Sequence, residues 1–212
     1  MQGKWISRGQ CPCGESSKGY NNHADGHAFC FSCNKRFNNV GEAKMEAKIV
    51  DIQNKVASTG DYGSIGDRRI SENTARKYRT KIKTNGSIIS HHYYEYYNAE
   101  GSHIATKIRQ VDGKRIWSQG DMGDALLFGQ NLFKSGGKYI TIVEGEIDAM
   151  SVYEMLGSKW AVVSIKNGVQ SAVQNCKQHL EYLNSFENVV VCFDTDKPGI
   201  EASQKVAQLF EP

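Results

Sequence analysis

Acidic residues follow two apolar runs at positions where a protein could hold a divalent cation. Glu144 comes directly after one run, and Asp194 and Asp196 come directly after another. In an extended segment, residues i and i+2 point to the same side, so Asp194 and Asp196 can act together. Carboxylate oxygens are the ligands that Mg²⁺ and Mn²⁺ prefer. The sequence therefore predicts a magnesium or manganese site.

Four of the six cysteines form two closely spaced pairs. They are Cys11, Cys13, Cys30 and Cys33. Two such pairs at this separation are typical of a tetrahedral zinc site between two β-turns. The first pair is tighter than usual, so His23 or His27 could replace one cysteine as a ligand. Four protein ligands leave no open coordination position, so we expect one zinc ion with a structural role.

Basic residues are concentrated in the middle of the chain. The net charge is +6 over residues 67–138 and −5 over residues 139–212. Side chains alternate along the run 103–111, so Lys107 and Arg109 project from one face of a strand. A basic surface beside an acidic metal centre suits a polyanion, although two oppositely charged subdomains could also merely neutralise each other.

The basic residues belong to a stretch with strand and hairpin signals. Strands are expected at 88–97, 103–111 and 114–118, with a tight turn at Asp112 and Gly113 joining the last two. A basic helix is expected after Ser71, with Arg76, Lys77 and Arg79 exposed. The residues in this part therefore favour an antiparallel sheet.

From residue 138 onward, strand-like and helical patterns alternate. Buried strands are expected at 139–143, 161–165 and 188–193, and helices at about 148–156, at 173–183 and from Pro198 onward. Such alternation predicts a parallel sheet with helices on its faces, which places Glu144 and Asp194 at the carboxyl ends of strands. Cys176 and Cys192 are expected in the core of this unit.

Shifts in composition divide the 212 residues into four predicted parts. These are a zinc-binding ribbon at 1–40, a linker at 41–66, a basic β-rich subdomain at 67–137 and an α/β unit at 138–212. The fold class is therefore α/β, or α+β overall. We see no membrane-spanning run and expect no membrane partner. Without a secretory signal, the clustered cysteines indicate a reducing compartment.

The order of these motifs resembles a known arrangement. A glutamate after a first strand and Asp-x-Asp after a third resemble the Toprim domain of primases, topoisomerases and related nucleases. The preceding cysteine pairs and the basic middle narrow the resemblance to the primase half of phage-type bifunctional primase–helicases, a DnaG-like group. Further matching segments are 69–72, 107–109, 124–129 and 164–168.

The resemblance implies a DNA primase, which makes short RNA primers on a single-stranded DNA template. It implies Glu144 as a metal ligand or general base, and Asp194 and Asp196 as ligands of the catalytic Mg²⁺ or Mn²⁺. Glu146 and Asp148 are further candidates. It also implies that basic side chains hold the triphosphate or the template, namely Lys107 and Arg109 first and then Lys114 and Arg115. The zinc ribbon would help to read the template sequence.

The resemblance also implies partners and a location. Ribonucleoside triphosphates are the substrates and the RNA primer is the product. A helicase domain belongs to the full-length protein, and a DNA polymerase takes over the primer. The implied location is the cytoplasm of a phage-infected bacterial cell.

Two features depart from the family pattern. The sequence has no G-x-x-x-x-G-K-[ST] phosphate loop, and the α/β unit stops one helix after Asp196, so we expect a C-terminally incomplete fragment. Two alternatives stay open, a non-catalytic Toprim protein that binds or loads single-stranded nucleic acid and a Toprim nuclease. The presence of Glu144, Asp194 and Asp196 argues against the first. The zinc module, with Lys107 and Arg109, argues against the second.

Overall fold

The computed structural model describes residues 5–9, 20–23, 28–30, 35–37 and 59–210. The chain divides into two compact units, Met1–Asp51 and Ile52–Pro212. In the first unit, the described strands form an antiparallel sheet in the order β1-β2-β3-β4. These strands are β1 (Trp5–Gly9), β2 (Tyr20–His23), β3 (Ala28–Cys30) and β4 (Lys35–Phe37). The predicted zinc ligands Cys11, Cys13 and Cys33 lie outside the described residues, and Cys30 is the last residue of β3.

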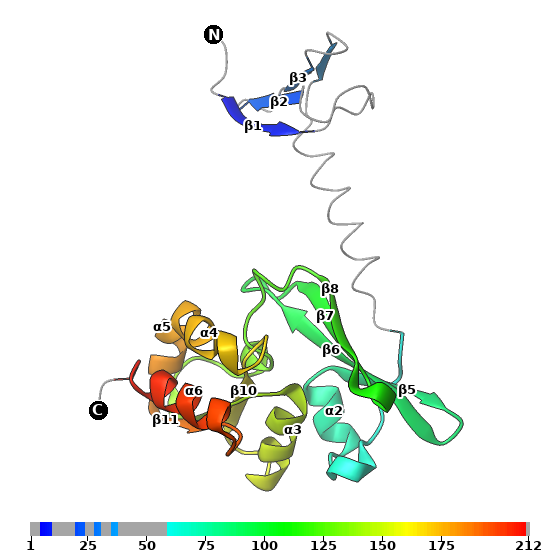
Figure 1. Cartoon of the computed structure of the whole chain (residues 1–212), viewed down its shortest axis with the longest axis vertical. Coiled ribbons are helices and arrows are strands. Elements are labelled where there is room, and N and C mark those ends of the chain that lie inside the picture. The colour runs from blue at the N-terminus through cyan, green and yellow to red at the C-terminus, as the bar shows by residue number, and fades with distance from the viewer. Residues whose placement is uncertain (1–4, 10–19, 24–27, 31–34, 38–58, 211–212) are drawn as a thin grey trace. The chain divides into compact units, whose positions relative to one another are not determined.

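The second unit contains an antiparallel sheet in the order β5-β6-β7-β8 (Figure 1). Its strands are β5 (Thr80–Asn85), β6 (Ile88–Tyr97), β7 (His103–Gln110) and β8 (Ile116–Gly120). The predicted strands and the turn are confirmed, and Gly113 has a φ of 77° that favours glycine. The sequence does not reveal β5, because Ile82 is its only apolar residue.

A parallel sheet in the order β10-β9-β11 forms the rest of the second unit. Its strands are β9 (Gly137–Val143), β10 (Ala161–Ser164) and β11 (Phe186–Cys192). Its helices are α3 (Glu146–Met155), α4 (Ala172–Gln178), α5 (Leu180–Asn184) and α6 (Lys197–Ala207). The mixed α/β class and the parallel sheet are confirmed. The single helical pattern expected at 173–183 is interrupted at His179.

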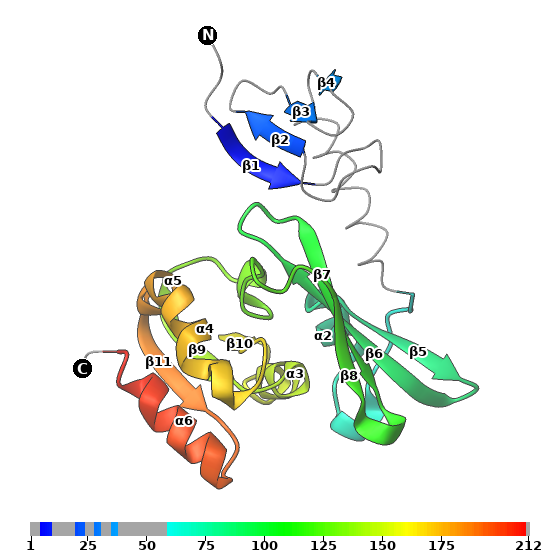
Figure 2. The same ribbon diagram turned by 45° about the horizontal axis from the view of Figure 1, so that its top comes forward.

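The parallel sheet packs on two hydrophobic cores because its side chains alternate between faces. Ile140 and Ile142 of β9 join the core that contains residues of α4, α5 and α6. Val143 joins the other core, which contains α3 and tyrosines of the antiparallel sheet. Figure 2 shows α3 on the side of the antiparallel sheet and α4 to α6 away from it. The core that contains α3 and these tyrosines therefore holds the two sheets of this unit together.

Cys176 is buried as expected, but the expectation that Cys192 lies in the core is wrong. Cys192 ends β11, which is an edge strand, and its side chain is exposed. An edge strand has a partner on one side only, so part of its surface faces solvent.

A short helix, α2 (Glu72–Lys77), packs beside α3. Ser71 caps it by accepting a hydrogen bond from the Thr74 backbone N–H at 3.2 Å. Arg79 is exposed as expected but lies beyond the helix. Four 3-10 turns complete the elements of the described residues: η1 (Gly66–Arg68), η2 (Asp112–Lys114), η3 (Gln130–Leu132) and η4 (Val169–Ser171). Among the described residues, no helix is long and apolar enough to cross a membrane.

Candidate active site

Glu144 and Asp194 meet at the carboxyl end of the parallel sheet. Strands β9 and β11 are neighbours, and Val143 is in register with Cys192, so the residues that follow them emerge side by side. The backbone N–H of Asp194 donates a hydrogen bond to Oε1 of Glu144 at 2.9 Å. The sheet order therefore brings together the two acidic motifs that are 50 residues apart in the sequence.

Negative charge is crowded at this edge. Partial burial raises the pKa of Glu144, and the charges of Asp194, Asp196 and Asp148 raise it further. Asp148 itself accepts a hydrogen bond from the Gly145 backbone N–H at 3.1 Å. Burial and the neighbouring carboxylates together outweigh the hydrogen bond from the Asp194 backbone, which lowers the pKa of Glu144.

Asp196 is the N-cap of α6. Its Oδ1 accepts a hydrogen bond from the Gly199 backbone N–H at 2.8 Å, and Pro198 occupies the first turn as expected. Gly199 is tightly confined, because an added Cβ would overlap the carbonyl oxygen of Asp194 and lie 2.9 Å from Oε1 of Glu144. The first turn of α6 therefore packs directly on the acidic edge.

The donors at this edge match the chemistry of a hard divalent cation. Their ligand atoms are carboxylate oxygens, and a cation would relieve the carboxylate repulsion that, after burial, raises the pKa of Glu144. In the part of the chain that the structure describes, no three histidine, cysteine, aspartate or glutamate side chains already converge as metal ligands do. The residues therefore fit magnesium or manganese by charge and donor type.

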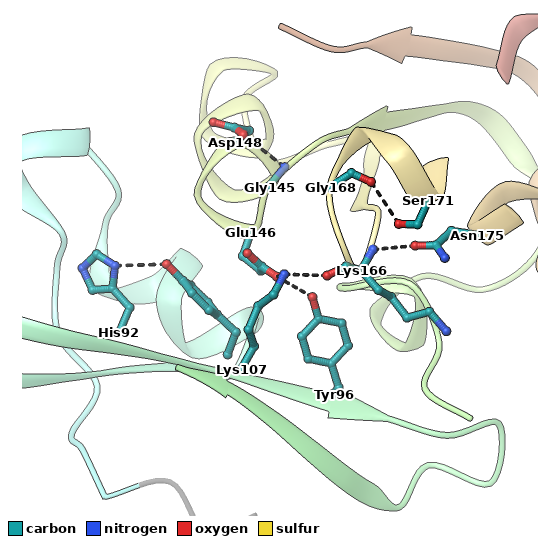
Figure 3. Close-up of polar contacts among 11 residues, drawn as sticks. His92, Tyr96, Lys107, Gly145, Glu146, Asp148, Lys166, Gly168, Ser171 and Asn175 are labelled. Carbon is teal, nitrogen blue, oxygen red and sulfur yellow. Dashed lines mark hydrogen bonds and ion pairs between the residues drawn. The ribbon is translucent and has the colours of Figure 1, made fainter. Parts of the chain in front are cut away.

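Lys107 crosses from β7 to the parallel-sheet half of the unit (Figure 3). Its Nζ donates to Oε1 of Glu146 at 2.5 Å and to the carbonyl oxygen of Lys166 at 2.6 Å. The hydroxyl of Tyr96, on β6, donates to the same Oε1 at 2.5 Å. The side chains of Lys107 and Glu146 are 13% and 10% exposed, so the ion pair is largely shielded from water.

Glu146 is thus committed to Lys107 and Tyr96. Burial and the charge of Glu146 raise the pKa of Tyr96 well above its ordinary value, so the hydroxyl stays protonated and donates. The ion pair connects β7 to the first turn of α3. This helix begins at Glu146, two residues after Glu144. Lys107 therefore meets Glu146 rather than the acidic residue predicted to do the chemistry.

The other predicted basic residues lie further along the same hairpin. Arg109 is two residues from Lys107 on β7 and is partly buried. Lys114 and Arg115 lie at the turn between β7 and β8, and both are exposed. The Arg115 guanidinium lies 5.6 Å from the centre of the Trp117 ring. Lys107 thus contacts the first turn of α3 directly, whereas Lys114 and Arg115 lie at the turn of the β7–β8 hairpin.

The sequence does not single out Tyr96, Asn175 or Gly199 as site residues. Tyr96 could have been noticed from the sequence, because side chains alternate along a strand and this places Tyr94 and Tyr96 on one face of β6. A glycine directly after Pro198, in the first turn of a helix, was also a signal of close packing. Asn175, on α4, accepts a hydrogen bond from the Lys166 backbone N–H at 2.8 Å. No sequence pattern indicates this contact, because tertiary packing sets it.

Known proteins resemble this chain in sequence and in structure. A family model described as Toprim-like matches residues 141–212. The DNA helicase/primase of Enterobacteria phage T3 is 33% identical, over 93% of this chain and 36% of that protein. The crystal structure of the primase fragment of the bacteriophage T7 primase-helicase protein matches with a TM-score of 0.66 and 28% identity. That match covers 98% of this chain and 87% of that one.

A second solved structure contains the bacteriophage T7 lagging-strand DNA polymerase interacting with the primase domains of two subunits, bound to an RNA/DNA hybrid and dTTP. It matches with a TM-score of 0.64 and 32% identity, over 72% of this chain and 76% of that one. This chain belongs to the primase part of the phage T7/T3-type helicase/primase family.

The resemblance inferred from the motifs is therefore confirmed. The Toprim-like match includes Glu144, Asp194 and Asp196, whereas Lys107 and Arg109 precede it on the antiparallel sheet. The chain spans 36% of the length of the phage T3 relative. The candidate site residues of this primase-family chain thus come from both sheets of its second unit.

Proposed function

We propose that this chain synthesises short RNA primers on single-stranded DNA by metal-dependent nucleotidyl transfer. The observation that carries the proposal is the meeting of Glu144 and Asp194 at the carboxyl end of the Toprim sheet. Membership of a primase family and the basic sheet beside this edge support the same reaction. Ribonucleoside triphosphates are the substrates.

The acidic residues have separate roles in this proposal. Asp194 and Asp196 hold Mg²⁺ or Mn²⁺, and Glu144 is either a further ligand or the base for the attacking 3′-hydroxyl. The bound metal would sharpen the nucleophile and stabilise the departing pyrophosphate. As the 3′-oxygen bonds to the α-phosphorus and pyrophosphate leaves, the hydroxyl proton must be accepted. Glu144, a carboxylate at this edge, would accept that proton.

The basic residues bind phosphates in this proposal. Lys107 and Arg109 hold the triphosphate or the template, and Lys114 and Arg115 contribute to nucleic-acid binding from the hairpin end. Their positive charge neutralises phosphate oxygens of either ligand. Lys107 is held by Glu146, the first residue of the helix that follows Glu144 in the chain.

The zinc ribbon and the partners are part of the same proposal. One structural zinc ion is bound by four cysteines, namely Cys11, Cys13, Cys30 and Cys33. The module that contains them reads the template sequence. A helicase domain belongs to the longer protein, and a DNA polymerase extends the primer. The related T7 structure, which combines primase domains, a DNA polymerase and an RNA/DNA hybrid, supports the polymerase as a partner.

Primer synthesis tests the proposal directly. The chain is incubated with single-stranded templates of varied sequence, ribonucleotides and Mg²⁺ or Mn²⁺. Asp194→Asn is compared with Glu201→Gln, which neutralises an exposed carboxylate on α6. We expect short RNA products from the unaltered chain and from Glu201→Gln, and a loss of about 100-fold or more for Asp194→Asn. Equal yields from both variants would overturn the role of the acidic edge.

A further inference from the structure

Lys166 is a buried lysine just after β10, and its charged group has no part in the reaction proposed above. The residue is 2% exposed. Its Nζ donates to the carbonyl oxygen of Ala125 at 2.7 Å and to that of Gly123 at 3.2 Å. A buried ammonium group is costly unless such partners are present. Burial lowers the pKa of Lys166, and the charges of Asp124 and Asp121 oppose that shift. The surroundings are therefore built to hold a lysine side chain.

The two carbonyl groups belong to the segment that connects the two sheets. This connector, residues 121–129, follows β8 and leads toward β9. Phe128, in the same connector, forms an antiparallel bridge with Ser164 of β10 through two backbone hydrogen bonds of 3.1 Å. Lys166 thus adds a side-chain tie, two residues beyond β10, to a connector that already pairs with the end of that strand.

The backbone of Lys166 faces the opposite way, toward Lys107. Its carbonyl oxygen accepts the hydrogen bond from Nζ of Lys107 at 2.6 Å, and its N–H donates to Oδ1 of Asn175 at 2.8 Å. Figure 3 shows the Lys166 side chain pointing away from Lys107 while its carbonyl group points toward it. One residue therefore joins the connector, α4 and the Lys107 side chain.

We propose that Lys166 is a positioning residue for Lys107. By tying its loop to the connector, the Lys166 ammonium group fixes the carbonyl oxygen to which Lys107 donates. That carbonyl and Glu146 together set the place of the Lys107 ammonium group. The consequence for nucleotide binding rests on the proposed function of Lys107, whereas the anchoring of Lys107 does not.

Lysine labelling tests the anchoring without any nucleotide. Acetylation by an N-hydroxysuccinimide ester, followed by mass spectrometry, measures how fast Lys107 reacts. Loss of the tie should free the Lys107 ammonium group, so we expect Lys107 to react about fivefold to tenfold faster in Lys166→Met. A tenfold change corresponds to about 1.4 kcal/mol of lost anchoring. The matched control is Lys177→Met, which removes an exposed lysine from α4 and should leave the rate unchanged.

An unchanged Lys107 rate in Lys166→Met, with native circular dichroism, would overturn the proposal. Lys166→Gln provides the same comparison if the methionine variant does not fold, since its amide can still donate one hydrogen bond. The expected result for Lys166→Gln is again faster labelling of Lys107 than in Lys177→Met.

A double-mutant cycle tests the consequence for nucleotide binding. The affinity for a fluorescent ATP analogue with Mg²⁺ is measured for Lys166→Met, Lys107→Met and the double variant. We expect Lys166→Met to weaken binding about tenfold alone and to add nothing when Lys107 is already replaced. Additive losses would contradict an action through Lys107. An unaltered chain that binds no nucleotide, yet shows the labelling difference, would refute the proposed function and leave the anchoring intact.

Discussion

Two glutamates separated by one residue have different environments, and the difference sets what each can do. Glu144 accepts a hydrogen bond from the Asp194 backbone and lies among carboxylates that raise its pKa. Glu146 is buried and forms an ion pair with Lys107. The position of Glu144 directly after a strand predicts its importance from the sequence. The ion pair of Glu146 could not be predicted, because it depends on how the two sheets pack.

At the same scale, His92 predicts a pH dependence of stability. It is 5% exposed and hydrogen bonds with the Tyr94 hydroxyl at 3.0 Å. Burial, with the positive charge of Arg109, lowers the pKa of His92 to about 4. Its ordinary pKa is about 6.5, so unfolding takes up a proton between these values. The stability that His92 contributes is fully present above pH 6.5 and is lost as the pH falls toward 4.

Replacing His92 by glutamine should weaken that pH dependence. The fall in the free energy of unfolding between pH 7 and pH 5 should be smaller by roughly 1–2 kcal/mol. Urea unfolding followed by circular dichroism at both pH values measures the difference. His91→Gln, at the neighbouring histidine, is the control. An identical pH dependence in His92→Gln and the unaltered chain would show that His92 already titrates normally in the folded protein.

At the scale of elements, local patterns predict the strands and packing decides their order. Alternation and turn residues predict β6, β7 and the hairpin, because these signals lie within one segment. Strand and helix alternation predicts the parallel sheet for the same reason. The order β10-β9-β11, which puts Glu144 beside Asp194 and exposes Cys192, depends on contacts between distant segments. The candidate site could therefore be named from the sequence, but its contacts could not.

The start of α6 provides a test at this scale. Gly199→Ala should force the first turn of α6 away from Asp194 and Glu144, because the new Cβ has no room. We expect the free energy of unfolding to fall by about 2 kcal/mol and primer synthesis to be lost. Glu201→Ala changes an exposed position of the same helix and should change neither the free energy of unfolding nor primer synthesis. Normal stability and activity in Gly199→Ala would contradict the close packing of α6 on the acidic edge.

At the scale of the whole molecule, two units divide the proposed work. The second unit has its own two hydrophobic cores and holds the acidic edge and Lys107. The predicted zinc ligands all precede it in the chain. Loss of zinc should therefore change template choice without unfolding the second unit. A small module with few aliphatic residues depends on its metal for folding, so the first unit alone should lose structure.

Cys30→Ser tests that division. We expect the variant to lose zinc, measured by atomic emission spectroscopy, and to lose its preference among template sequences, measured by mapping primer start sites. Binding of a fluorescent ATP analogue by the second unit should remain within about twofold of the unaltered chain. Cys192→Ser, at an exposed position of β11, is the control. Unchanged start sites in a zinc-free variant would refute the recognition role.

The most direct test of the central claim is the affinity of the chain for Mn²⁺, measured by electron paramagnetic resonance without nucleotide or DNA. The claim is that Glu144, Asp194 and Asp196 hold a divalent cation at the carboxyl ends of β9 and β11. We predict that Asp194→Asn weakens Mn²⁺ binding about tenfold or more, because the cation loses a charged ligand. Glu201→Gln should bind as the unaltered chain does. Equal Mn²⁺ affinity in Asp194→Asn and the unaltered chain would contradict the claim.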